Sequence, residues 1–129
     1  MTTITPIHTG VADHIGHYAD AVTVSGGGTT IFVSGTPGVR EDGTLPDDFT
    51  EEARQCWTNV ETALRKAGAE LTDIVYMRQW VTSRDNASAY LAVSKEFIRH
   101  RPGGMFSIID GLVWPDIRVE VEVIAVLPA

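Results

Sequence analysis

Two carboxylates on one face of a predicted strand are the first candidates for chemistry. From 117 to 126 apolar residues alternate with charged ones, which predicts a β-strand with one buried face and one face carrying Arg118, Glu120 and Glu122. The turn-rich connection before this strand contains Trp114, an aromatic residue able to line a pocket. Paired carboxylates beside an aromatic loop suit acid–base chemistry. The alternative is a half-buried strand with a solvated polar face, which is the commoner origin of this pattern.

Composition argues against several classes of protein. The chain has 129 residues and a net charge of −7, with 17 acidic side chains against 10 Lys and Arg, so no nucleic-acid partner is expected. No apolar run approaches the roughly 18 residues of a membrane span, and the first residues lack the features of a signal peptide. The one cysteine, Cys56, lies on the apolar stripe of a predicted helix and is expected to be a core thiol. These features favour a cytoplasmic protein with no membrane partner.

The elements that must position these residues are strands interrupted by two helices. Strands are predicted within 3–9, 18–25, 29–34, 74–81, 102–109 and 117–126, and helices within 48–67 and 85–101. The strands 18–25 and 29–34, joined by three glycines, are predicted to form a hairpin. The expected fold class is α+β, a mixed sheet with two helices on one face, in a single domain covering 1–129. The other face would then be uncovered, and burial against further copies of the chain is the natural remedy.

Four segments of the chain are similar to the Rid family, also called YjgF-type or reactive-intermediate deaminases. They are Ile15–Val22, Ile31–Pro37, the passage 59–75 and Val119–Val126, in the same order and spacing. The resemblance implies a chorismate-mutase-like fold and a homotrimer whose sheets pack into a central barrel, with small-molecule clefts between subunits. Members of the family hydrolyse imines and enamines to a keto acid and ammonia without a metal or organic cofactor, so no cofactor is expected here.

The resemblance carries several of the family's site residues onto this chain. Tyr18 matches a pocket tyrosine, and Ser34 and Gly35 match a segment that offers backbone groups. Glu120 matches a glutamate that holds or activates a water molecule. An asparagine that is common on the family's second helix is replaced here by Leu91.

The family's substrate-binding arginine has no counterpart in this chain. Aligning Ser107 with the family's next residue puts Phe106, or otherwise Met105, in the place of the arginine. Neither side chain offers a charged fork to a substrate carboxylate. Weak or absent activity on standard 2-imino acids is therefore expected, and a larger or less charged ligand is favoured. Phe106, Met105, Ser107 and Trp114 are expected to line the cleft.

Two other arginines could take over carboxylate binding. Arg78 lies in a predicted strand, and Arg118 shares a strand face with Glu120. For Arg118 a charge partner on the sheet is the nearer explanation.

His17 stands where the family has a proline before the tyrosine. Its near-neutral titration would suit general acid–base work beside Tyr18. The alternative is a loop histidine that is exposed or caps a turn. With His8 and His14 it fits no zinc-binding spacing, so no metal site is expected.

The leading hypothesis is a cofactor-independent enzyme that works on a small molecule at the clefts between trimer subunits. The reaction would be hydrolysis of an imine, enamine or related unsaturated intermediate, or proton transfer on it, with Glu120 orienting water and His17 or Tyr18 moving protons. One alternative is a non-catalytic trimer that binds a small ligand or has a regulatory role. An endoribonuclease is the least favoured, because the chain is acidic and has no basic stripe.

Overall fold

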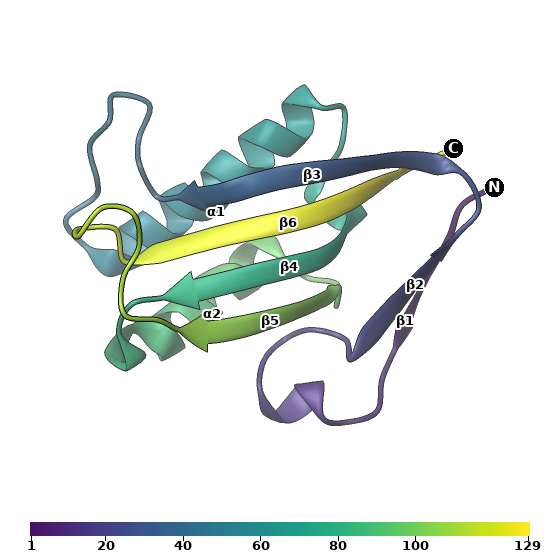
Figure 1. The fold of residues 1–129 in the computed structure, drawn as a ribbon, viewed down its shortest axis with the longest axis horizontal. Helices are drawn as coiled ribbons and strands as arrows, with labels where there is room; N and C mark the ends of the chain where they lie inside the picture. The colour runs from purple at the N-terminus through teal and green to yellow at the C-terminus, as the bar shows by residue number, and fades with distance from the viewer.

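A four-stranded sheet with two helices packed against one of its faces forms the body of the molecule (Figure 1). The structure is a computed structural model and describes residues 1–129. The strands are β1 (Thr3–Ile7), β2 (Ala21–Ser25), β3 (Gly28–Pro37), β4 (Ile74–Val81), β5 (Gly103–Ile108) and β6 (Val119–Pro128), and the helices are α1 (Phe49–Lys66) and α2 (Ala87–Phe97). Short 3-10 turns lie at η1 (Ala12–His14), η2 (Leu71–Asp73) and η3 (Arg84–Asn86). Neither α-helix is long and apolar enough to cross a membrane.

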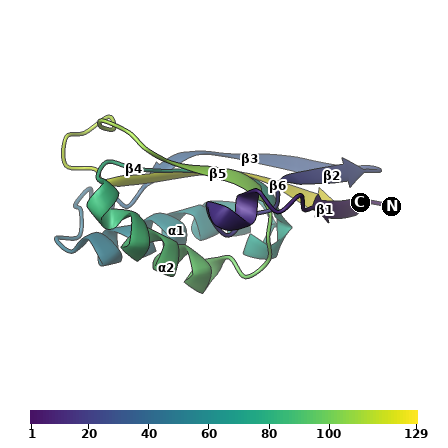
Figure 2. The ribbon, with the colours of Figure 1, turned by 90° about the horizontal axis from the view of Figure 1, so that it is seen from below.

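The main sheet has the strand order β3-β6-β4-β5. The pairs β3–β6 and β4–β6 are antiparallel, whereas β4 and β5 are parallel. Both helices lie on the same side of this sheet, and its other side is open (Figure 2). The predicted α+β class, with a mixed sheet and two helices on one face, is confirmed.

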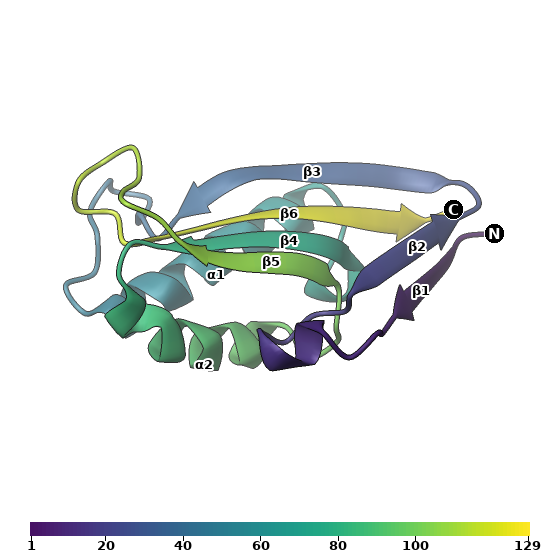
Figure 3. The same cartoon turned by 60° about the horizontal axis from the view of Figure 1, so that its bottom comes forward.

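The predicted hairpin between 18–25 and 29–34 is wrong. β2 pairs antiparallel with β1, from Thr3 opposite Ser25 to Ile7 opposite Ala21, while β3 pairs with β6. The glycines between β2 and β3 turn the chain with positive φ at Gly26 and Gly28 but do not pair the strands that they connect. The β1–β2 ribbon therefore extends from one end of the main sheet (Figure 3).

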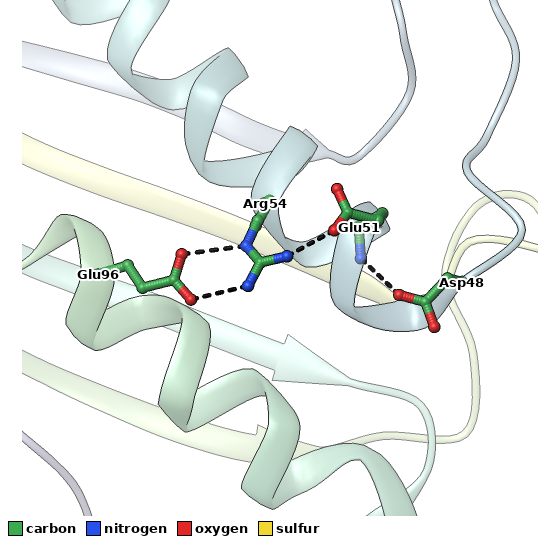
Figure 4. A network of polar contacts seen from close by, with 4 residues as sticks. All are labelled: Asp48, Glu51, Arg54 and Glu96. Carbon is green, nitrogen blue, oxygen red and sulfur yellow. Dashed lines mark hydrogen bonds and ion pairs between the residues drawn. The ribbon is translucent and has the colours of Figure 1, made fainter.

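Helix α1 begins at an N-cap and is tied to α2 through surface charges. Asp48 accepts a hydrogen bond from the backbone N–H of Glu51 at 3.1 Å. The Glu51 side chain does not accept a reciprocal bond from the backbone N–H of Asp48 and pairs with Arg54 at 2.5 Å instead. Arg54 also donates two hydrogen bonds to Glu96 of α2, at 3.0 and 3.1 Å (Figure 4). The buried stripe of α1 includes Cys56, so the expectation of a core thiol is confirmed.

A buried chain of polar side chains connects both helices to the sheet. The indole N–H of Trp57 in α1 donates to the Tyr90 hydroxyl of α2 at 3.3 Å, and that hydroxyl donates to Gln79 of β4 at 2.5 Å. The Gln79 amide then donates to the carbonyl of Met105 in β5 at 3.2 Å. Each of these three side chains donates a hydrogen bond, so the network fixes the position of β5 relative to the helices.

Candidate functional site

The open face of the sheet carries a group of polar and aromatic side chains. In β6 the buried residues alternate with Glu120 and Glu122, which therefore point away from the helices. In β4 the buried Met77, Gln79 and Val81 alternate with residues on the open side. These open-side residues are Tyr76, Arg78 and Trp80. The register places Glu122 opposite Arg78 and Glu120 opposite Trp80, so the two strands form a continuous surface.

Glu120 lies against the backbone of the bulged segment of β3. The register between β3 and β6 shifts between Val33 and Thr36, which leaves Ser34 and Gly35 as a bulge. A Cβ atom placed on Gly35 would lie 3.0 Å from a carboxylate oxygen of Glu120. The structure thus brings Ser34, Gly35 and Glu120 together, and the missing side chain at Gly35 leaves room for the carboxylate.

Burial raises the pKa of the Glu120 carboxyl, and the neighbouring charge of Glu122 raises it further. Both causes disfavour the charged form of Glu120. A carboxyl whose pKa is shifted toward neutrality can take a proton from water and return it in a later step. Glu120 is therefore the best candidate for a general acid–base group on this face.

Helix α1 holds the end of β3 in place from the opposite side of the sheet. The Cys56 thiol donates to the carbonyl of Thr36 at 3.0 Å, and the Thr36 hydroxyl donates to the carbonyl of Ser34 at 2.7 Å. Asn59 donates to the carbonyls of Pro37 and Val39 at 2.9 and 2.8 Å. Burial raises the pKa of the Cys56 thiol. This thiol therefore remains protonated as a structural donor and is not a nucleophile.

In β5, Met105 and Ser107 face the open side and Phe106 does not. Met105 lies opposite Arg78 and Ser107 opposite Trp80, and paired residues share a face. Phe106 lies opposite the buried Gln79 and stacks on Tyr90 of α2 with a ring separation of 5.0 Å. The expectation that Phe106 lines a cleft on this face does not hold, because its ring packs against the core. Met105 is the residue that faces the open side.

Trp114 lies in the loop between β5 and β6, where its carbonyl accepts a hydrogen bond from the backbone N–H of Ile117. It is 47% exposed and lines a depression of about 540 Å³ between two loops, together with Asp47 and Arg118. The aromatic residue next to Glu120 in the sheet is Trp80, which the sequence analysis did not single out. Alternation along 74–81 was the signal that could have found it, since Trp80 is on the same face as Arg78.

Arg118 is held by a helix and not by a carboxylate of its own strand. Its Nε donates to the buried Glu52 of α1 at 2.7 Å, and its backbone N–H donates to the same carboxylate at 2.8 Å. A further nitrogen of its guanidinium donates to the carbonyls of Pro46 and Asp47. The expected pairing on the sheet is therefore replaced by a pair with Glu52, and the guanidinium is occupied.

His17 and Tyr18 lie at the other end of β5. The backbone N–H of Ala19 donates to the carbonyl of Pro102, and Ala19 bridges to Gly103. Tyr18 is buried, and burial raises the pKa of its hydroxyl. Burial lowers the pKa of His17, and the positive charge of Arg101 lowers it further. His17 is therefore mainly neutral at neutral pH and able to accept a proton.

His17 lines a depression of about 410 Å³ between the η1 turn and α2. Leu91, Lys95 and Arg101 line it as well. No group of three or more His, Cys, Asp or Glu side chains is arranged to hold a metal ion.

Tyr18 and Glu120 are too far apart to act on one small molecule within one chain. Tyr18 is next to the Gly103 end of β5, whereas Glu120 shares a row of the sheet with Trp80 and Ser107. Gly103 and Ser107 are separated by roughly 13 Å, at about 3.3 Å per strand residue. The structure therefore brings Glu120, Ser34, Gly35, Met105 and Ser107 to one open face and places His17 and Tyr18 at a distance.

Comparison with known proteins relates nearly the whole chain to one family. Residues 10–127 match the family described as Endoribonuclease L-PSP. The chain is 29% identical over 115 residues to a 2-iminobutanoate/2-iminopropanoate deaminase of Dermatophagoides farinae, covering 88% of both chains. It is 31% identical over 103 residues to the RutC family protein YjgH of Escherichia coli, covering 78% of both.

The fold also has solved counterparts. The crystal structure of YyfB from Yersinia pestis, described as a protein of unknown function of the conserved Rid protein family, superposes with a TM-score of 0.82. That match covers 98% of both chains at 24% sequence identity, so it supports the fold alone.

Proposed function

Because the chain belongs to the Endoribonuclease L-PSP family, which is the Rid family, we propose that it converts a small imine or enamine at a site completed by a neighbouring subunit. The name of the Dermatophagoides farinae relative supports imine chemistry for this chain. The observation that carries the proposal is the position of Glu120, which is half-buried on an open face against the Ser34–Gly35 bulge. A carboxyl with a raised pKa on an open face suits the activation of water.

The proposed reaction is hydrolysis of a carbon–nitrogen double bond. Glu120 as a carboxylate accepts a proton from water while the water oxygen bonds to the imine carbon. The imine nitrogen takes a proton from His17 or Tyr18 in the same step, which gives a carbinolamine. Glu120 then gives its proton to the carbinolamine nitrogen, the carbon–nitrogen bond breaks while the hydroxyl proton returns to His17 or Tyr18, and a carbonyl compound and ammonia leave. This sequence needs no metal or organic cofactor, because the proton transfers run through side chains.

The proposal places the site between subunits, in a homotrimer as the family resemblance implies. In this arrangement the His17–Tyr18 end of one subunit lies near Glu120 of the next, and His17 or Tyr18 moves the second proton. The roughly 13 Å between the two ends of β5 supports this arrangement, because a small substrate cannot span it within one chain. The open face also presents Phe32, whose side chain is 74% exposed and is suited to burial against another copy.

The proposed substrate is not a standard 2-imino acid. Met105 is one of the two residues that the family alignment puts in the place of the substrate-binding arginine. It faces the open side of the sheet, and its thioether offers no charged donor. The nearest cation on that face, Arg78, is paired with Glu122 at 2.5 Å. A carboxylate would lose its hydration in this site without gaining a free ion pair.

Hydrolysis of freshly generated 2-iminopropionate, measured as ammonia and keto acid, tests this proposal. We expect slow turnover by the wild-type protein and a gain of about tenfold or more in Met105→Arg, because a bidentate carboxylate contact is restored. Phe106→Arg is the matched control, expected to gain nothing because its side chain faces the core. Fast turnover by the wild type would contradict the proposed substrate preference. Binding of a ligand without turnover of any imine would favour the non-catalytic alternative.

A further inference from the structure

A small hollow on the open face contains an ion pair that the proposed reaction does not use. The hollow has a volume of about 220 Å³ and is lined by Phe32, Ser34, Arg78, Glu122 and Ile124. Its walls are mainly apolar, and its charged groups are the guanidinium of Arg78 and the carboxylate of Glu122. Apolar walls with a few convergent polar groups are typical of small-molecule sites.

The charges around this hollow disfavour an anionic ligand. Arg78 is the one cation, and its partner Glu122 neutralises it. Glu120 adds a second carboxylate in the same strand, close enough for the charge of Glu122 to act on it. With both carboxylates ionised the group carries a net charge of about −1, so an approaching carboxylate is repelled and must displace Glu122 to reach Arg78.

An uncharged amide fits the same groups without breaking the ion pair. Arg78 touches Glu122 through one nitrogen and one carboxylate oxygen, and both side chains are partly exposed. The guanidinium of Arg78 therefore has further N–H groups that can donate to a ligand, and the carboxylate of Glu122 has a second oxygen that can accept from it. A carboxamide or ureido group presents a carbonyl acceptor and an N–H donor side by side, which is the complementary pattern.

We propose that the Arg78–Glu122 pair recognises a neutral amide-like group of the ligand, so that the substrate is an imine or enamine bearing a carboxamide or ureido group in place of a free carboxylate. This inference rests on the proposed function and specifies the substrate class of the same site. Arg78 and Glu122 are then the residues that determine specificity. Glu120, two residues away on the same face of β6, remains the group that acts on water.

Equilibrium binding of pyruvamide and of pyruvate to the ligand-free protein tests the inference independently of turnover. We expect the amide to bind the wild type more tightly by about tenfold, a factor that corresponds to one charge-assisted hydrogen bond. Glu122→Gln releases Arg78 from its ion pair and is expected to reverse the preference in favour of pyruvate. Arg78→Met is expected to weaken amide binding without gaining pyruvate binding.

The matched control is Glu61→Gln, which removes a carboxylate paired with Arg65 on the outer side of α1 and should leave both affinities unchanged. Tighter binding of pyruvate than of pyruvamide by the wild type would overturn the inference, as would an unchanged preference in folded Glu122→Gln. Failure of both ligands to bind would also overturn it. The proposed imine hydrolysis is judged separately, by the turnover of Met105→Arg on 2-iminopropionate.

Discussion

At Glu120 the sheet holds a carboxylate where its charge is poorly solvated. Burial and the charge of Glu122 both raise its pKa, while no cation lies in contact to compensate. A purely structural carboxylate is normally paired, as Glu52 is with Arg118. An unfavourable environment of this kind is typical of groups that take part in proton transfer.

Glu120→Gln tests this description through stability as well as activity. The folded pKa of Glu120 lies above its unfolded value of about 4.3, so the native state binds more protons between the two values. Stability therefore falls as the pH rises through that window, and the loss remains above it. We expect Glu120→Gln to melt at a higher temperature than the wild type at pH 8 and at the same temperature near pH 3. Imine hydrolysis should fall by about 10²-fold or more.

Thermal melting at several pH values checks the stability part. The exposed Glu41 provides the control, since Glu41→Gln should leave the melting temperature unchanged at both pH values. A Glu120→Gln variant that melts lower than the wild type at pH 8 would show that the carboxylate stabilises the fold.

Sequence reasoning at the residue scale placed two candidates on one strand but could not separate its two faces. Aligning Ser107 with the family left Phe106 and Met105 as adjacent candidates, and a shift of one residue in a strand exchanges its faces. The register with Arg78 and the stacking on Tyr90 decide the matter, and both depend on residues far away in the chain. Trp80, by contrast, was accessible from local alternation.

At the scale of elements, one buried ion pair joins three parts of the chain. Glu52 in the first turn of α1 accepts from both the side chain and the backbone of Arg118, just before β6. Arg118 in turn donates to the carbonyls of Pro46 and Asp47 in the loop that leads to α1. The pair therefore fixes the end of the sheet at which β6 begins and Glu120 lies.

Glu52→Ala is expected to lower the free energy of unfolding by about 3 kcal/mol, because it removes the buried acceptor of the Nε and of the backbone N–H of Arg118. Glu51→Gln, one residue earlier, removes an exposed pair with Arg54 and should cost no more than about 1 kcal/mol. Urea unfolding of the two variants measures the difference. Equal losses would mean that the buried pair has no special role in stability.

Helices were more predictable than strand partners, for a physical reason. The apolar stripe that contains Cys56 and Trp57 is a local pattern with the period of a helix, and it is buried as predicted. Which strand pairs with a given strand depends on segments that are far away in the sequence. The local pattern of glycines after β2 suggested a hairpin between β2 and β3, but β3 pairs with β6 instead.

At the scale of the whole molecule, the open sheet face is the feature that needs a partner. Phe32 is 74% exposed there, and Tyr76 is 36% exposed. Apolar side chains gathered on one sheet face favour association with other copies of the chain. The location of a site at such an interface could be expected from the family resemblance, whereas the pairing of ends is set by contacts between chains and leaves no local pattern in the sequence.

Phe32→Glu is expected to dissociate the proposed assembly, because burial of an unpaired carboxylate in an apolar interface is costly. Ala63→Glu adds the same charge to the exposed side of α1 and should leave the assembly intact. Sedimentation velocity of both variants measures the outcome. A Phe32→Glu protein with the wild-type mass would contradict burial of the open face between copies.

Cross-linking between His17→Cys and Glu120→Cys in one double variant tests the shared site most directly. The native Cys56 is buried and therefore does not compete for the reagent. A bifunctional maleimide too short to span the roughly 13 Å between the two ends of β5 is used, so a link within one chain is excluded. Thr62→Cys on the exposed side of α1, in place of Glu120→Cys, is the control. We predict covalent dimers and trimers on a denaturing gel for the first variant and none for the control. Monomers alone, from a protein shown to be oligomeric, would contradict a site shared between subunits.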